Sequence, residues 1–164
     1  MQVMILAHNK NLLHYLYDAI EHRKIASVGY YIGGMKQKDL KASEDKDVII
    51  ATYAMAEEAL DIKTLTTLIM APPKTDVTQA VGRILRSRHN KPLVFDIIDI
   101  HDTFKKQWLK RKKFYNSNKY KILYCENYKS NIWEELEEKK KSTKKISLKK
   151  EPIITGLTAL DAFI

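Results

Sequence analysis

Cysteine, proline and glycine are scarce in this chain of 164 residues, which holds one cysteine, four prolines and five glycines. The lone Cys125 excludes an internal disulfide and a cysteine-based zinc cluster. No glycine is followed by lysine, so the sequence has no G-x-x-x-x-G-K-[ST] loop to cradle nucleotide phosphates. A D-E-x-[DH] sequence that could hold Mg²⁺ is missing too. We therefore expect the chain alone not to hydrolyse a nucleotide.

Long apolar runs are also missing. Before His8 and Asn9 the N-terminus offers only the apolar residues 3–7, too few for a signal peptide or a membrane span. We therefore expect a protein of the cytoplasm, the nucleus or a virion, with no membrane contact. The length and a hydrophobic fraction of 45% predict about one globular domain.

Basic residues are concentrated toward the C-terminus. Residues 1–102 are formally neutral, so the whole net charge of +9 resides in residues 103–164. Such asymmetry is typical of proteins with a polyanionic partner, most often nucleic acid, although a solvated lysine-rich tail would look the same. Composition predicts a core of residues 1–102, a basic and aromatic extension of residues 103–138, and a lysine-rich flexible linker with a short apolar end, residues 139–164.

Short apolar runs alternate with helical patterns through the core. We expect strands at residues 3–7, 27–32, 47–52, 66–71 and 93–99, and helices at residues 10–22, 36–43 and 76–86, with a loop or single helical turn at residues 53–59. The near-continuous Val/Ile/Leu runs predict an α/β fold, a parallel sheet of about five to six strands with helices on both faces. Beyond the core we expect a helix at residues 103–113, a strand at 119–125 and a short charged helix at 130–140.

Residues 79–86, QAVGRILR, form the most informative stretch. Gln79, Arg83 and Arg86 lie at i, i+4 and i+7 and share one face of the predicted helix. Two arginines and an amide on an exposed face make a fork for phosphate oxygens, because arginine stays charged and donates in a planar, bidentate geometry. The apolar residues fall about half a turn away and would face a core: Val77, Val81 and Ile84.

The carboxyl ends of the predicted strands are the second candidate site. In parallel α/β sheets, ligands bind at these ends, where loops and helix N-termini present backbone N–H groups. We expect four such ends to lie along one rim: His8 with Asn9, Gly33 with Gly34, Thr52 with Tyr53, and the turn at residues 73–76.

Each candidate also has a structural explanation. Gln79 follows Asp76 by three residues and could complete a capping box. The two arginines could be solvated, Thr52 an ordinary strand residue, and His8 a histidine with a purely structural contact.

Three segments in order resemble the motifs of superfamily-two helicases. VMILAHNKNLLHYL resembles motif four, GYYIGGMKQKDLKASEDKDVIIATYAMAEEALDI resembles the segment leading into motif five, and TDVTQAVGRILR resembles motif six. The resemblance covers residues 3–99. This part of the chain is similar to the C-terminal RecA-like domain of the XPB-like and poxvirus transcript-release helicases. An unrelated flavodoxin-like domain would require all three motifs to be coincidence.

The resemblance implies a role for each candidate. Arg83 and Arg86 would be arginine fingers that reach the γ-phosphate of ATP, which a first motor domain would hold with Mg²⁺. Gln79 would help position the attacking water or the phosphate. Glu58 and Asp61 of motif five would touch the nucleotide or couple it to the nucleic acid. Contacts to the phosphates of one strand would come from the rim and the lysines beside it: His8, Asn9, Lys10, Gly33, Gly34, Lys36, Thr52 and Tyr53. In motif five, Ala59 replaces the usual glycine of E-G-L-D.

The function implied is that of the second motor domain of an ATP-dependent helicase or translocase, with DNA favoured over RNA. Such a domain needs a RecA-like partner domain that carries the Walker motifs, in cis or in trans. The alternative is a non-catalytic nucleic-acid-binding or assembly module derived from a helicase.

The basic extension mixes cations with aromatic residues, a combination that can track a phosphate backbone and stack bases. Phe104 and Trp108, at i and i+4, would instead pack their helix onto the sheet. Predicted phosphate contacts on the outside of this helix are Lys110, Arg111, Lys112 and Lys113. Residues 153–164 are a candidate docking segment with a spacing similar to sliding-clamp-binding peptides, or a short helix that folds back.

Overall fold

The computed structural model describes residues 2–58, 62–85, 92–99, 101–125 and 132–136. The chain divides into two compact units, of which the first is Met1–Ile97 and the second begins at Ile98. Within the described part of the chain, none of the helices combines the length and the apolar character needed to cross a membrane.

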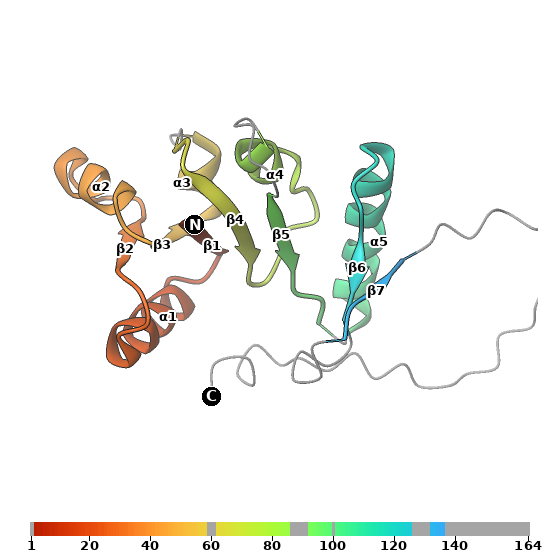
Figure 1. Cartoon of the computed structure of the whole chain (residues 1–164), viewed down its shortest axis with the longest axis horizontal. Coiled ribbons are helices and arrows are strands. Elements are labelled where there is room, and N and C mark those ends of the chain that lie inside the picture. Colours follow the sequence, from red (N-terminus) through yellow and green to blue (C-terminus); the bar gives the residue numbers. More distant parts are fainter. Residues whose placement is uncertain (1, 59–61, 86–91, 100, 126–131, 137–164) are drawn as a thin grey trace, which may run out of the picture. The chain divides into compact units, whose positions relative to one another are not determined.

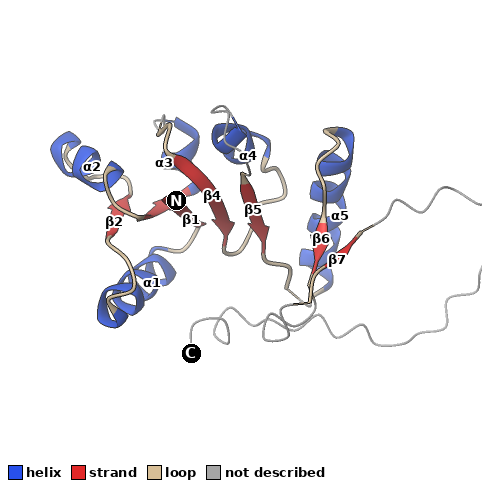
Figure 2. Ribbon diagram, in the orientation of Figure 1, coloured by secondary structure: helices blue, strands red, loops and turns tan. Residues whose placement is uncertain are grey.

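The first unit is built on a five-stranded sheet in the order β2-β3-β1-β4-β5 (Figure 2). Its strands are β1 (Gln2–Ala7), β2 (Val28–Tyr31), β3 (Val48–Thr52), β4 (Leu65–Met70) and β5 (Leu93–Asp96). All neighbouring pairs are parallel. The predicted α/β fold with a parallel sheet is confirmed, although β5 ends three residues earlier than expected.

Four helices connect these strands: α1 (Lys10–Arg23), α2 (Gln37–Glu44), α3 (Tyr53–Glu58) and α4 (Thr78–Leu85). Figure 1 shows α1 on one side of the sheet and the other three on the opposite side. The topology explains this division. The step from β1 to β2 runs toward one edge, whereas the later steps run toward the other. Because parallel crossovers are right-handed, opposite steps place their helices on opposite faces.

Apolar side chains from both faces of the strands form the core. On the α1 side, Ile5 and Ala7 of β1 pack in one cluster with Leu13, Leu16 and Ile20 of α1. The intervening strand residues, Met4 and Leu6, are buried too, as alternation in a strand buried on both faces requires. The predicted inward face at α4 is confirmed, since Val77, directly before the helix, and Val81 and Ile84 within it are at most 2% exposed.

Two glycines are needed for backbone geometry. A Cβ added at Gly29 of β2 would lie 2.9 Å from Cβ of Ser43, so glycine lets α2 approach the sheet closely. Gly34 has a φ of +93°, in the region that favours glycine. It therefore lets the chain turn between β2 and α2.

The second unit contains α5 (Asp102–Ser117) and a small antiparallel pair, β6 (Leu123–Tyr124) with β7 (Glu134–Glu135). The charged helix expected at residues 130–140 is wrong for the described residues 132–136, which include β7. Cross-strand contacts explain the difference, because Lys121 Nζ lies 2.7 Å from Glu135 Oε2 and Leu136 N–H donates to the Ile122 carbonyl at 3.0 Å.

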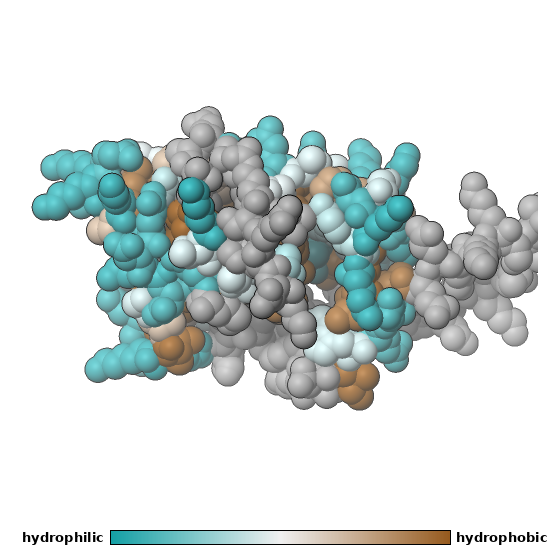
Figure 3. All heavy atoms as spheres, turned by 45° about the horizontal axis from the view of Figure 1, so that its top comes forward, coloured by the Kyte–Doolittle hydropathy of each residue, from teal (hydrophilic) through white to brown (hydrophobic). Residues whose placement is uncertain are grey.

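On the face shown in Figure 3, most described residues are hydrophilic.

Candidate nucleic-acid interface

An open cleft lies at the carboxyl edge of the sheet, where β1 and β3 end. Its volume is about 500 Å³, and we call it the rim cleft. The residues that line it are His8, Lys10, Gly33, Thr52, Tyr53, Ala54, Met55 and Lys74. The structure therefore brings together residues from all four ends that the sequence predicts to share a rim, with Lys74 coming from the turn at residues 73–76.

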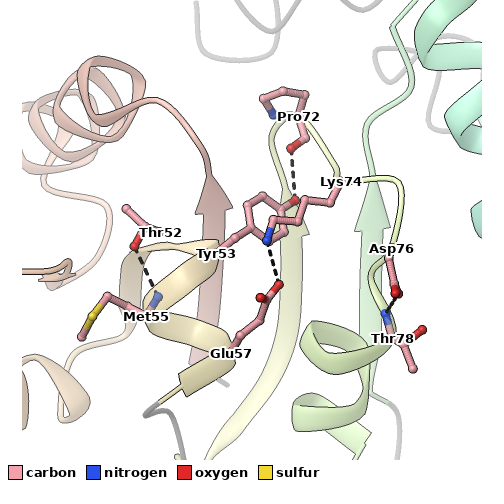
Figure 4. Close-up of polar contacts among 8 residues, drawn as sticks. All are labelled: Thr52, Tyr53, Met55, Glu57, Pro72, Lys74, Asp76 and Thr78. Atoms are coloured by element: carbon pink, nitrogen blue, oxygen red, sulfur yellow. Dashed lines mark hydrogen bonds and ion pairs between the residues drawn. The ribbon is translucent and has the colours of Figure 1, made fainter.

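The floor of the rim cleft is aromatic. The rings of His8, after β1, and Tyr53, at the start of α3, stack with their centroids 4.6 Å apart and an interplanar angle of 29°. Tyr53 is only 2% exposed, and its hydroxyl donates to the Pro72 carbonyl at 3.1 Å (Figure 4). Because Pro72 follows β4, this side chain links the ends of β3 and β4.

Lys74 is a cleft residue that none of the sequence motifs singles out. Its Nζ atom lies 2.9 Å from Glu57 Oε1 of α3 and 5.1 Å from the centroid of the Tyr53 ring (Figure 4). The ion pair joins residues 17 positions apart, across the whole of β4. A basic residue in the turn after a strand is the only signal in the sequence, and it does not identify the partner.

Positive charge in the rim cleft comes from lysine rather than histidine. Burial lowers the pKa of His8 below its ordinary value of 6.5, the nearby Lys74 ammonium lowers it further, and Glu57 acts in the opposite direction. His8 is therefore mainly neutral at pH 7. Among the residues that line the cleft, Lys10 and Lys74 carry the cationic charge.

Two of the predicted phosphate contacts have local structural roles. The Asn9 side chain accepts a hydrogen bond from Asn11 N–H at 2.8 Å and caps α1. Thr52 Oγ1 accepts from Met55 N–H at 3.4 Å at the start of α3. These bonds fix the directions of two helices that begin at the rim. Three predicted residues are exposed but do not line the cleft: Asn9, Gly34 and Lys36.

A side-chain hydrogen bond lies at the start of α4, the helix of the predicted arginine fork. Asp76 Oδ1 accepts from Thr78 N–H at 3.0 Å, and hydrogen bonds from the backbone and side chain of Thr78 lower the pKa of Asp76 (Figure 4). Gln79 is exposed, opposite the buried face, as predicted. Four further candidates lie outside the description, two by their side chains (Glu58 and Arg83) and two entirely (Asp61 and Arg86). The fork stays a prediction.

In α5, the expectation that Arg111 lies on the outside is wrong. Arg111 is 1% exposed, and its Cζ atom lies 5.9 Å from the centroid of the Trp108 ring. Trp108 in turn lies near Tyr115, with ring centroids 6.1 Å apart, so one helix face combines aromatic rings with a buried guanidinium. Lys110 and Lys113 are exposed, and Lys112 is partly exposed. The predicted docking segment, residues 153–164, lies outside the described residues.

Sequence comparisons link the chain to viral proteins. No family model matches it. It is 40% identical over 125 residues to a protein of Acanthamoeba polyphaga mimivirus named "Putative ATP-dependent RNA helicase", covering 73% of this chain and 24% of that protein. A protein of African swine fever virus with the same description is 26% identical over 150 residues, or 80% of this chain and 30% of that protein. The chain thus spans less than a third of either relative.

Solved structures share the fold. The C-terminal domain of the DEAD-box protein Dbp5 matches with a TM-score of 0.56 at 19% identity, over 70% of this chain and 71% of that one. The C-terminal part of the Fun30 ATPase domain matches with a TM-score of 0.57 at 13% identity, over 66% of this chain and 38% of that one. At these identities the likeness concerns the fold.

Proposed function

Since the chain is a helicase C-terminal domain with the RecA-like fold, we propose that it is the second motor domain of an ATP-dependent nucleic-acid helicase or translocase. The observation that carries the proposal is the rim cleft. It gathers lysines, an aromatic floor and the start of α1 at the carboxyl edge of a parallel sheet, where such folds bind their ligands.

The rim cleft would grip the backbone of one strand. Lys10 lines the cleft and is also the first residue of α1, so the positive end of that helix lies at the cleft wall. A phosphate placed there would meet backbone N–H groups and a lysine ammonium. Such contacts read no base sequence. We therefore propose binding to single strands of DNA or RNA, with DNA favoured by the resemblance to XPB-like helicases.

The exposed face of α4 would serve ATP hydrolysis. Gln79 lies on this face. Arg83 and Arg86 follow it in the sequence by four and seven residues, the spacing expected of residues that share one helix face. The two guanidinium groups would stabilise the charge that spreads over the γ-phosphate oxygens in the transition state. ATP with Mg²⁺ would be held mainly by a first RecA-like domain with Walker motifs, in cis or in trans. This chain alone would hydrolyse no ATP.

Nucleic-acid-stimulated ATPase activity tests the proposal. The tagged chain is recovered from its native source together with its partners, beside an Arg86→Ala variant and an Arg88→Ala variant as the matched control outside the motif. We expect activity to co-purify, to fall by at least about a thousandfold in Arg86→Ala, and to persist in Arg88→Ala. If no sample hydrolyses ATP while all bind nucleic acid equally, the chain is instead a non-catalytic binding module.

A further inference from the structure

The Lys74–Glu57 pair lies beside the rim cleft, which Lys74 lines, and joins two elements that the chain connects only through β4. Lys74 belongs to the loop between β4 and α4, and Glu57 belongs to α3. The side chains are 30% and 28% exposed, so water and small ions reach both. The ammonium also lies above the Tyr53 ring, which is itself held by its hydrogen bond to Pro72.

We propose that Lys74 contacts a backbone phosphate of the bound strand, and that Glu57 is an intramolecular competitor for Lys74 that the phosphate displaces. The inference rests on the proposed function of the rim cleft. It adds Lys74 as a residue that binds the strand and Glu57 as a residue that lowers the affinity for the strand.

The geometry favours an exchange of partners at Lys74. A partly exposed ion pair contributes little net stability, because water solvates both charges. The cation–π contact with Tyr53 does not depend on Glu57. Tyr53 therefore holds the Lys74 ammonium at the cleft after the ion pair with Glu57 breaks. Lysine suits such an exchange, since its ammonium is a compact point charge that accepts any arrangement of oxygens. A phosphate oxygen can therefore take the place of Glu57 Oε1 without a rearrangement of the cleft.

The competitor also explains why an acidic side chain stands beside a phosphate-binding cleft. A protein that moves along a strand must release each phosphate as well as bind it. Glu57 offers Lys74 an alternative partner at 2.9 Å, so the loss of the phosphate leaves no unpaired lysine. Affinity differences within one interface arise mainly in the dissociation rate. We therefore expect Glu57 to speed dissociation of the strand and to leave association almost unchanged.

A double-mutant cycle on the full chain tests this exchange, with Lys74→Gln, Glu57→Gln and the double variant. The probes are fluorescein-labelled oligo(dT) and oligo(U), followed by anisotropy over a range of salt. We expect Lys74→Gln to weaken binding about threefold to tenfold. The salt slope, which is the steepness of the fall of log affinity with log salt concentration, should decrease by about 0.7. Glu57→Gln should tighten binding about threefold through slower dissociation. The double variant should bind like Lys74→Gln alone, because on this inference Glu57 weakens binding by competing for Lys74.

Control variants separate this exchange from net charge and from folding. Lys63→Gln and Glu21→Gln remove the same charges at exposed positions outside the cleft lining, and we expect them to change affinity less than about twofold. If Lys74→Gln lowers the melting temperature, Lys74→Met replaces it, because methionine keeps an apolar stem over Tyr53.

Two results would overturn the inference while leaving the rim cleft as the binding site. In the first, the wild type binds both probes and Lys74→Gln binds them equally well. In the second, Glu57→Gln tightens binding as much in the Lys74→Gln background as alone, which would show general repulsion between Glu57 and the strand. If the wild type binds neither probe even at low salt, the proposed function fails, and the inference fails with it.

Discussion

The ring of His8 stacks on the ring of Tyr53, so the residue that follows β1 packs against the residue that begins α3. Partial burial of the imidazole and the nearby Lys74 ammonium favour its neutral form. The packing of the rim cleft therefore influences whether His8 is protonated.

A pH dependence of stability follows from this stack. The pKa of His8 is lowered in the folded state, so the unfolded chain takes up a proton first as the pH falls. The contribution of His8 is fully present above the unfolded value of about 6.5 and is lost as the pH falls below it. Urea unfolding between about pH 7.5 and pH 5.5 should show a smaller loss of unfolding free energy for His8→Phe than for the wild type. Equal losses would contradict the prediction.

Asp76 should stabilise the start of α4, the helix of the proposed arginine fingers. Replacing it with alanine removes the acceptor for Thr78 N–H and should lower the unfolding free energy by about 1 kcal/mol at neutral pH. The folded pKa of Asp76 lies below 3.8, so this contribution is present above that value and is lost as the pH falls through the folded pKa. Chemical unfolding at several pH values measures the effect.

Asp76→Asn is the control for this prediction. Asparagine keeps the side-chain oxygen and is an equally good cap, so it should retain most of the stability but lose the dependence on acid pH. A loss as large as that of alanine would show that the negative charge, rather than the hydrogen bond, matters.

The parts of the molecule that the sequence predicts are those set by local periodicity and by topology. The buried face of α4 follows from the spacing of Val77, Val81 and Ile84, and no distant residue can change which face they share. The rim follows from the parallel sheet, because the carboxyl ends of its strands meet at one edge. Both predictions needed only the knowledge of which segments form helices and which form parallel strands.

The parts that the sequence misses depend on pairs of distant residues or on helical phase. The ion pair of Lys74 with Glu57 forms only because β4 brings the loop after it beside α3. In the run of residues 110–113, four adjacent cations look alike, yet the helix turns Arg111 toward the face of Trp108 and Tyr115 and leaves Lys110 and Lys113 exposed. Charge alone does not distinguish them.

Two neighbouring threonines of β4 should respond oppositely to the same substitution. Thr67 is 4% exposed, and within the described part of the chain its hydroxyl oxygen has no hydrogen-bond partner. Valine has nearly the same shape, so Thr67→Val should raise the unfolding free energy by about 1 kcal/mol. By contrast, the Thr66 hydroxyl donates to the Gln2 carbonyl at 3.1 Å and accepts from Gln2 N–H at 3.3 Å, where the register of β1 and β4 shifts.

Thr66→Val is therefore the matched control, and it should lower the unfolding free energy by about 1 kcal/mol. Urea unfolding of the two variants beside the wild type gives both values. A loss of stability in Thr67→Val would mean that its hydroxyl is bonded in solution.

In α5, a buried and an exposed cation should have separable effects on stability and on nucleic-acid binding. Arg111→Met removes the guanidinium that lies against Trp108 and should lower the unfolding free energy by about 1–3 kcal/mol. Its affinity for oligo(dT) should stay within about twofold of the wild type, because a residue 1% exposed contacts no phosphate.

The double variant Lys110→Gln with Lys113→Gln should behave in the opposite way. Both lysines are exposed on α5, so their removal should leave unfolding unchanged. If both contact the strand, the salt slope of binding should fall by about 1.4, which is two single-strand phosphate contacts. Thermal unfolding and anisotropy on the same samples measure both quantities. A drop in affinity for Arg111→Met with none for the double variant would place the binding face of α5 on its aromatic side, where stacking of bases rather than lysine charge would hold the strand.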